Sequence, residues 1–503
     1  MFEHLARLNR ENPDFEVGCV YLIGLLDVAE RARTGLKMEP LEYDMGLFRK
    51  TRELVARHRL SDLGREEFWE VDNDYADRVF HAGVDLLVEL GAYDVTTGRA
   101  IRFSEDEVGL AAREAPTQVT MGTGKDARVI RRRRMEDENP PAVIVAGHTG
   151  WSDEVPVPLH IAVREMVRDP RIDAIQGFMY ARTDGLEITG EAHWAYGARR
   201  AIERARNGLD AAGRPGLCLI QYPTHTRAFV LISTLDPENG LRRSDGTLFS
   251  IQPDLHIESG MIAASLVMEE YGLAYKENQG GGTSFAGDVY ASMIVSVASR
   301  LSAWMCYRDV VQGPGTAALP SGPQRRGSTV GGQGGVSNVA NLKWLSFAVR
   351  KALLRNTRII TKAQIWGGHS STEDQMSEEF LLRVALSAME TTLLGDNFHF
   401  SGSANPPTYP RWAIDVSDAT IASGLKLKDY LEMERKIGER LPQPDVTAFN
   451  DFRMKVYERP RELLDPQMKV YDFFKQRISE EYLENERRVR KYLTDLGLSL
   501  GNI

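Results

Sequence analysis

Cysteine is scarce in this sequence, which has three in 503 residues. Cys19, Cys218 and Cys306 lie far apart and form no Cys-x-x-Cys pair. This spacing indicates neither a disulfide framework nor a cysteine zinc site. A chain with so little cysteine suits a reducing compartment, and we expect a cytoplasmic protein.

An excess of basic residues is also missing. The formal net charge is −9 and the pI is about 5.7, so we expect neither nucleic acid nor an anionic membrane as a partner. The apolar run from Val20 to Leu26 is far too short to span a bilayer. It has neither a basic segment before it nor a small-residue cleavage site, so no signal peptide is predicted.

Three familiar catalytic motifs are absent. The segment Gly122–Ala127 suggests a phosphate-binding loop, but Val119 stands where the earlier glycine is needed and Asp126 where Ser or Thr must follow the lysine. No Gly-x-Ser-x-Gly turn is present, which argues against an α/β-hydrolase nucleophile. No Gly-x-Gly-x-x-Gly follows the first predicted strand, which argues against a dinucleotide-binding fold.

What the sequence does contain, from about residue 141, is an alternation of short apolar segments with helical ones. The expected strands are Ala142–Ala146, Ala174–Met179, Leu217–Tyr222, Leu248–His256, Leu273–Glu277, Val310–Gln312, Ile359–Trp366 and Asn397–Phe400. The expected helices between them include Gly190–Asn207, Gly260–Tyr271, Tyr290–Tyr307, Val339–Leu354 and Ser377–Leu394. Eight such repeats predict an α/β fold, a (β/α)8 TIM barrel, with an open doubly wound sheet as the alternative.

Two flanking regions are predicted to be helical. Residues 1–140 form an N-terminal extension, in which Asp74–Leu90 has helical apolar spacing and Ser104 begins a capping box closed by Glu107. Residues 141–405 form the barrel. Residues 406–503, rich in Glu, Arg and Lys, form a helical C-terminal extension packed on the barrel.

Glu277 is the first candidate for chemistry. It lies near the end of an apolar predicted strand and is followed, after two residues, by three glycines, Gly280 to Gly282. A carboxylate at a strand's C-terminal end beside such a turn is well placed for acid, base or electrostatic work. The competing interpretation is a structural salt bridge with Lys276 or another neighbour.

Two further predicted strands end in polar or aromatic residues. Gln364 and Trp366 are two apart before a Gly-Gly turn, so both side chains would point the same way. An aromatic face such as that of Trp366 can hold a quaternary ammonium, although a packing role is the simpler interpretation. In the strand that begins at Leu217, Ile220 is followed by Gln221 and Tyr222 at the predicted polar tip.

Histidines raise the alternative of a metal site. His225, His256 and His369 fall near predicted strand ends, and Glu258 would share a strand face with His256. None of them has strong ligand spacing, and we expect no bound metal.

Four segments resemble one known family. They are the Ser-Glu-Asp-Glu helix followed by Gly122–Ala127, the stretch Ala212-Gly-Arg-Pro-Gly216, the segment from Glu277 to Ala286-Gly287, and Thr357–Trp366. Together they resemble the corrinoid-dependent monomethylamine methyltransferases over about residues 27–496. The resemblance implies a barrel, in a homo-oligomer, that transfers a methyl group from a small methylated amine to the Co(I) of a separate corrinoid-binding protein. It also implies no permanently bound cofactor, an active-site Glu at Glu277 and an active-site Gln at Gln364.

The chain departs from this family at its most important position. The family's pyrrolysine aligns with Ile220, or with Gln221 if the gap moves, and Trp366 stands where the family has a tyrosine. We therefore expect a substrate that needs no adduct, such as a quaternary amine. Glu277 would balance its charge, Gln364 would orient it, Trp366 would stack on it, and Ile220, Gln221 and Tyr222 would line the pocket. The alternatives are a catalytically inactive binding barrel and a metal-assisted barrel lyase or hydrolase.

Overall fold

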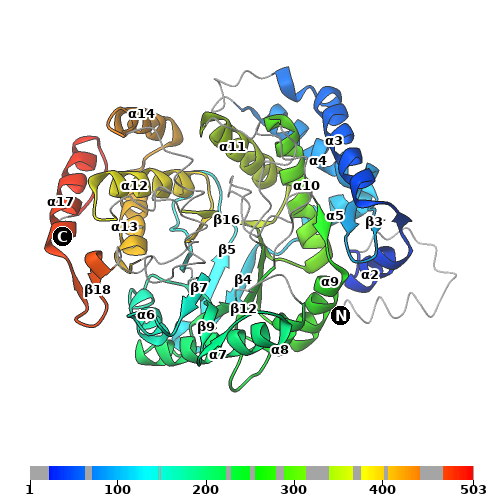
Figure 1. The fold of residues 1–503 in the computed structure, drawn as a ribbon. Helices are drawn as coiled ribbons and strands as arrows, with labels where there is room; N and C mark the ends of the chain where they lie inside the picture. Colours follow the sequence, from blue (N-terminus) through cyan, green and yellow to red (C-terminus); the bar gives the residue numbers. More distant parts are fainter. Residues whose placement is uncertain are drawn as a thin grey trace.

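Eight parallel strands form a closed ring. Figure 1 shows the helices arranged around the central strands. The computed structural model describes residues 22–62, 71–145, 147, 149–221, 228–249, 255–278, 288–312, 339–365, 375–400, 406–441 and 468–501. The ring runs β6 (Val143–Val145), β8 (Ala174–Gln176), β11 (Cys218–Gln221), β12 (Gly246–Phe249), β14 (Tyr275–Asn278), β15 (Val311–Gln312), β16 (Ile360–Gln364) and β17 (Asn397–His399). The α/β class is confirmed, and the sheet closes instead of remaining open.

A helix follows each of these strands in the chain, on the outside of the ring. In chain order they are α6 (Leu159–Met166), α7 (Glu191–Ala211), α8 (Ala228–Ser233), α9 (Ser259–Tyr271), α10 (Val289–Tyr307), α11 (Val339–Asn356), α12 (Glu378–Leu393) and α13 (Thr408–Ala422). A small side sheet of β7 (Thr149–Ser152), β9 (Met179–Thr183) and β10 (Leu186–Glu187) interrupts the pattern beside β6 and β8. Among the described helices, α10 is long and apolar enough to cross a membrane, but 94% of that stretch is buried in the protein core.

The N-terminal region is helical only in part. Helices α2 (Leu25–Thr34), α3 (Pro40–Arg57), α4 (Asn73–Glu89) and α5 (Glu105–Glu114) are present, and α4 packs against α10 and α11 (Figure 1). The capping box of α5 is confirmed: the Ser104 hydroxyl accepts from the Glu107 amide at 3.2 Å, and the Glu107 carboxylate accepts from the Ser104 amide at 2.8 Å.

This region also contributes strands to a four-stranded sheet, which the prediction of a helical extension did not include. Its order is β1 (Leu36–Lys37), β3 (Arg99–Ile101), β2 (Ala92–Asp94) and β13 (His256–Ile257). Gly91, at a φ of 83°, follows the end of α4. The Asp94 carboxylate then accepts hydrogen bonds from the Thr96 amide and the Thr97 hydroxyl, which turns the chain back as a hairpin.

A second hairpin, β4 (Gln118–Met121) and β5 (Arg128–Arg131), closes the N-terminal end of the barrel. Val119 and Met121 alternate with exposed residues and join the apolar interior of the ring. The Gly122 amide donates to the Ser244 carbonyl at 2.7 Å, and the Thr123 amide donates to the Gly216 carbonyl at 2.8 Å. Ser244 and Gly216 immediately precede barrel strands, so the Gly122–Ala127 turn lies at the end opposite the strand tips.

Asp126, Arg214 and Gly216, which we call the basal cluster, hold this hairpin in place. The Asp126 carboxylate accepts from the Gly216 amide at 3.1 Å and lies 3.5 Å from the Arg214 Nε. The Arg214 guanidinium also donates to the carbonyls of Val167 and Ile172, at 3.1 and 2.7 Å. Two of the segments that carry the family resemblance therefore meet here in a structural role.

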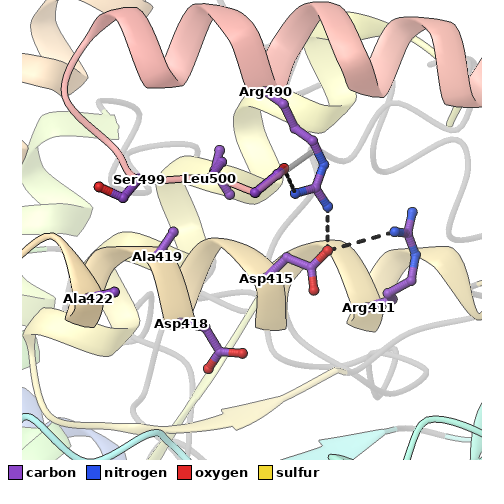
Figure 2. Close-up of a pocket in the computed structure, with 9 residues that line it drawn as sticks. Arg411, Asp415, Asp418, Ala419, Ala422, Arg490, Ser499 and Leu500 are labelled. Carbon is purple, nitrogen blue, oxygen red and sulfur yellow. Dashed lines mark hydrogen bonds and ion pairs between the residues drawn. The ribbon is translucent and has the colours of Figure 1, made fainter. Parts of the chain in front are cut away.

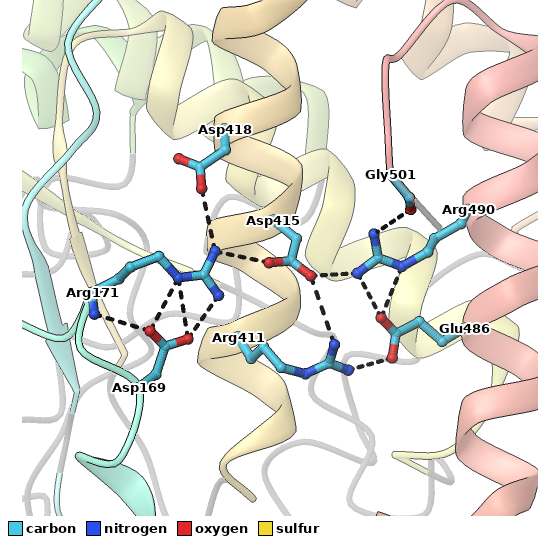
Figure 3. A network of polar contacts seen from close by, with 8 residues as sticks. All are labelled: Asp169, Arg171, Arg411, Asp415, Asp418, Glu486, Arg490 and Gly501. Carbon is cyan, nitrogen blue, oxygen red and sulfur yellow. Dashed lines mark hydrogen bonds and ion pairs between the residues drawn. The ribbon is translucent and has the colours of Figure 1, made fainter. Parts of the chain in front are cut away.

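The C-terminal helices α14 (Leu427–Gly438) and α17 (Glu480–Asp495) pack beside α12, and the short hairpin β18 (Tyr471–Asp472) and β19 (Arg477–Ile478) precedes α17 (Figure 1). A chain of ion pairs connects them to the barrel (Figure 3). Arg171, which precedes β8, lies 2.9 Å from Asp415 on α13, and Asp415 also pairs with Arg490 on α17. Hydrophobic clusters cross both predicted boundaries, near 140 and 405; the three-part division stays a prediction.

Candidate functional site

Strand β14 presents two polar groups to the barrel interior. Tyr275 packs among the hydrophobic side chains that fill the barrel interior, and Glu277, two residues later, shares its face of the strand. Lys276 lies between them and points outward, where its Nζ is 3.1 Å from the Ser265 hydroxyl and 3.4 Å from the Glu269 carboxylate of α9. Alternation along one strand thus separates two adjacent charges by the thickness of the barrel wall.

The Glu277 carboxylate is fully buried, and its bonding partners among the described residues are side chains. Its Oε2 lies 2.8 Å from the Lys362 Nζ of β16 and accepts from the Tyr275 hydroxyl at 2.5 Å. Its Oε1 accepts from the Gln176 amide of β8. Neither β8 nor β16 is a neighbour of β14 in the ring, so these contacts cross the barrel interior. We call Glu277, Lys362, Tyr275 and Gln176 the interior cluster of polar residues.

Burial sets the charge state of the groups around Glu277. Burial lowers the pKa of Lys362, and the negative charge of Glu277 opposes that effect. Burial, together with Glu277, raises the pKa of Tyr275 well above its usual value, so this phenol stays neutral and donates. Burial and the nearby Lys362 hold the pKa of His399, on β17, well below its usual value, so the imidazole is neutral.

A second buried acid lies close to this cluster. Burial raises the pKa of Asp309, just before β15, well above that of a free aspartate, while Lys276 lowers it, Glu277 raises it and Lys362 lowers it. Burial in turn lowers the pKa of the outward-facing Lys276 to about 8. Buried ions of this kind are costly unless they are paired, and perturbed groups gathered at one end of a barrel mark a functional site.

The structure places the predicted residues unequally. Glu277 lies inside the barrel as expected, and Ile220 is fully buried in the same interior. Gln364 is the last residue of β16 and pairs with His399 of β17. Trp366, Tyr222, His225 and His369 lie outside the described residues.

Gln221 does not line the interior. Its Oε1 accepts from the Thr234 hydroxyl at 2.7 Å, at the end of α8 outside the ring. The reason is the two-residue period of a strand: Ile220 points inward, so its neighbour must point outward. The prediction that Gln221 contacts substrate is therefore wrong for this arrangement.

The expected strand Leu248–His256 is also corrected. Of its described residues, Leu248 and Phe249 belong to barrel strand β12, while His256 lies in the outer sheet. Its Nε2 is 3.3 Å from Asp44, and its ring lies against Tyr43 and Tyr93. Among the residues that the structure describes, no group of three or more His, Cys, Asp or Glu side chains could hold a metal ion.

Sequence reasoning missed Lys362, Gln176, Tyr275 and His399. The sequence does contain a signal for Lys362. Ile360, Lys362 and Gln364 are spaced two apart and so share one face of the predicted strand. Two polar residues on the face that begins with Ile360 are unusual for a strand that only packs in a core. For Gln176 there was none beyond its place at a strand end, because its partner is 101 residues away in sequence.

A surface hollow of about 450 Å³ lies between α13 and the end of the chain (Figure 2). Of its charged groups, Arg411 and Arg490 pair with Asp415, and Asp418 pairs with Arg171. It lies on the outer face of α13 beside α17, so we assign it no part in the chemistry.

Comparisons with known proteins point to one family. The family model for monomethylamine methyltransferase MtmB matches residues 23–314. A monomethylamine methyltransferase MtmB of Methanosarcina mazei is 28% identical over 291 residues, covering 56% of this chain and 60% of that protein. MtmB2 of Methanosarcina acetivorans is 27% identical with the same coverage. The chain thus aligns with about three fifths of the length of these curated relatives.

The fold agrees along nearly the whole chain. The crystal structure of the Methanosarcina barkeri monomethylamine methyltransferase matches with a TM-score of 0.76 and 22% identity, over 96% of this chain and all of that one. A crystal structure of the hydroxylamine MtmB complex matches equally well. On the family match to residues 23–314, this chain belongs to the monomethylamine methyltransferase MtmB family.

Proposed function

We propose that this protein is a methyltransferase that moves a methyl group from a methylated amine to the Co(I) of a separate corrinoid protein. Family membership supports the reaction class. The observation that carries the proposal for this chain is Glu277: a fully buried carboxylate, inside the barrel at the C-terminal end of β14, whose partners in the described part of the chain are side chains. Barrel enzymes place their chemistry at this end.

The substrate is a pre-activated amine, with a quaternary ammonium as the leading candidate. Ile220 has an alkyl side chain inside the barrel and cannot form the covalent adduct that pyrrolysine would. A quaternary nitrogen needs no adduct, because its positive charge already makes the departing amine a good leaving group. Glu277 stabilises that charge, while Gln364 and Trp366 orient the ammonium and Tyr222 and Ile220 form the wall. The outward-facing Gln221 has no part.

The second substrate is the Co(I) corrinoid, which supplies the nucleophile and is carried by a partner protein. The rate gain in such a reaction comes mainly from holding the methyl group in line with the approaching nucleophile. A homo-oligomer remains our expectation for the assembly. No tightly bound cofactor of this chain itself is proposed.

Methyl transfer to free Co(I) cobalamin tests the function directly. The purified protein is given a panel of primary to quaternary methylated amines, and the cobalt absorbance change reports transfer. We expect turnover with a quaternary member and none with monomethylamine. The same assay on the variant Glu277→Gln tests the role of the buried carboxylate. Glu432→Gln, on the exposed face of α14, makes the same chemical change away from the barrel interior and serves as its matched control. If no member of the panel is turned over, the methyltransferase proposal fails; tight binding without turnover would favour the inactive binding barrel.

Substitutions at Trp366 test the aromatic contact with the cation. Trp366→Phe should retain part of the attraction and Trp366→Leu should lose it, so affinity for a charged ligand falls in that order by steps of about 0.5–2 kcal/mol. A neutral ligand of the same shape should show a flatter series. Melting temperatures are followed in parallel. Equal responses to charged and neutral ligands would leave Trp366 as a packing residue.

A further inference from the structure

The Glu277 carboxylate already has a cation beside it. The Lys362 Nζ lies 2.8 Å from the Glu277 Oε2, and the two side chains are 1% and 0% exposed. A methylated ammonium bound beside Glu277 would be the second positive charge next to one carboxylate. In a barrel interior, that uncompensated charge is expensive to hold away from water.

We propose that Lys362 is a proton-releasing counter-ion of Glu277, so that a methylated ammonium binds as the Lys362 ammonium becomes a neutral amine. This inference rests on the proposed function, because it takes a methylated cation as the ligand. It assigns Lys362 a positioning role: the residue acts on the substrate through the carboxylate it pairs with.

Lys362 is the group that can yield its charge. A quaternary ammonium has no proton to lose, whereas a lysine has one. Burial already lowers the pKa of Lys362, and a second cation nearby would lower it further. A neutral lysine amine can still donate a hydrogen bond to Glu277, so the carboxylate keeps its orientation while its charge becomes available to the ligand.

The other groups around Lys362 do not remove the need for this step. Tyr275 on β14 and His399 on β17 are neutral, for the reasons given above. Gln176 on β8 carries no charge and already donates to Glu277. Among the groups that the structure describes near Lys362, Asp309, before β15, could also release a proton when a cation binds, because burial raises its pKa. It must therefore be tested separately.

The charges balance over a full cycle. Binding of R₃N⁺–CH₃ releases one proton from Lys362 to solvent. The carbon–nitrogen bond then breaks as the methyl group passes to Co(I), which gives neutral R₃N and methyl-Co(III). When the neutral amine departs, Lys362 takes a proton back, and the Glu277–Lys362 ion pair is restored.

Calorimetric titration with tetramethylammonium, without any corrinoid, tests the inference. Heats measured in buffers of different ionisation enthalpy give the number of protons released, and we expect close to one per bound cation at pH 7. Affinity should rise about tenfold per pH unit while Lys362 of the free protein is protonated. Asp309→Asn should keep this release, which separates Lys362 from the second acid.

Two substitutions of Lys362 sharpen the test. Lys362→Arg keeps a charge that cannot be lost, so binding should weaken at least tenfold and release no proton. Lys362→Met removes the charge, so binding between pH 8 and 10 should no longer depend on pH. Melting curves show whether each variant is folded, and one folded variant is enough.

The outcomes separate the two proposals. If tetramethylammonium binds without proton release, or binds Lys362→Arg as well as the wild type, this inference is wrong and the proposed function stands. Release that disappears in Asp309→Asn also overturns it. No binding of the cation at any pH overturns the cation site itself, and with it both proposals.

Discussion

The two ends of the barrel hold their buried charges in different ways. In the basal cluster, Arg214 donates to backbone carbonyls and Asp126 accepts from a backbone amide. At the other end, the partners of Glu277 among the described residues are the side chains of Lys362, Tyr275 and Gln176. Charges tied to the backbone fix the path of the chain. Charges tied only to side chains can exchange partners while the chain stays in place, which is what a binding site requires.

The largest expected effect comes from breaking the basal cluster. Arg214→Met removes a buried guanidinium, so Asp126 loses its charged partner and the carbonyls of Val167 and Ile172 lose a donor. We expect the free energy of unfolding to fall by about 3–5 kcal/mol. Chemical denaturation measures this, and transfer activity per folded molecule should be unchanged. A stable variant with lost activity would contradict the structural role of this end.

Ile220→Ala tests the region between the two ends. Ile220 is fully buried in the same apolar cluster as Met121 of the basal hairpin. Truncation leaves a cavity, and we expect a loss of about 2–5 kcal/mol in the free energy of unfolding. The conservative variant Ile220→Val should lose far less. If Ile220→Ala loses activity without losing stability, the side chain does more than fill space.

The same contrast explains what could be predicted from the sequence. Seven of the eight barrel strands agree with the expected ranges to within three residues at each end, because short apolar runs alternating with helices are a local pattern. The eighth expected strand, Leu248–His256, begins near β12 but runs past its end. Glu277 was found for the same reason, since a strand end beside glycines is visible in sequence. Its partner Lys362 lies 85 residues further along, and the ring alone brings the two together.

Two predictions are wrong because local sequence pattern does not determine the direction of a side chain at a strand end or the sheet that a short strand joins. Gln221 was placed with Ile220, but one step along a strand reverses the direction of a side chain, and it bonds to Thr234 outside the ring. His256 was assigned to a barrel strand, yet it extends the outer sheet by pairing with Tyr93 of β2. Long-range pairing partners of this kind leave no periodic trace in one sequence.

Glu277→Gln should have the opposite effect to Arg214→Met: activity should fall while the protein stays folded. The amide keeps the shape and removes the charge, and Lys362 can lose its proton instead of remaining as an unpaired ion. We therefore expect a folded protein whose cation binding or methyl transfer falls about tenfold or more, which corresponds to about 1.4 kcal/mol. Initial rates and calorimetric affinities measure this. Activity near that of the wild type in a folded variant would remove Glu277 from the mechanism.

The smallest expected effect is on how stability depends on pH through His399, at the end of the barrel that holds Glu277. His399 is fully buried, and its pKa in the folded protein lies well below its ordinary value of 6.5. Between these two values the unfolded chain binds a proton that the folded protein does not, so stability rises with pH up to about 6.5 and is lost as pH falls below it. One proton gives a slope of at most about 1.4 kcal/mol per pH unit.

His399→Gln should flatten the stability profile below pH 6.5 and leave it unchanged above pH 7. Unfolding measured across pH 5 to 8 tests this, with His81→Gln on the exposed face of α4 as the control. An unaltered acid slope in His399→Gln would mean that the imidazole can take up its proton in the folded protein beside Lys362, and the charge balance derived for this end would then be wrong.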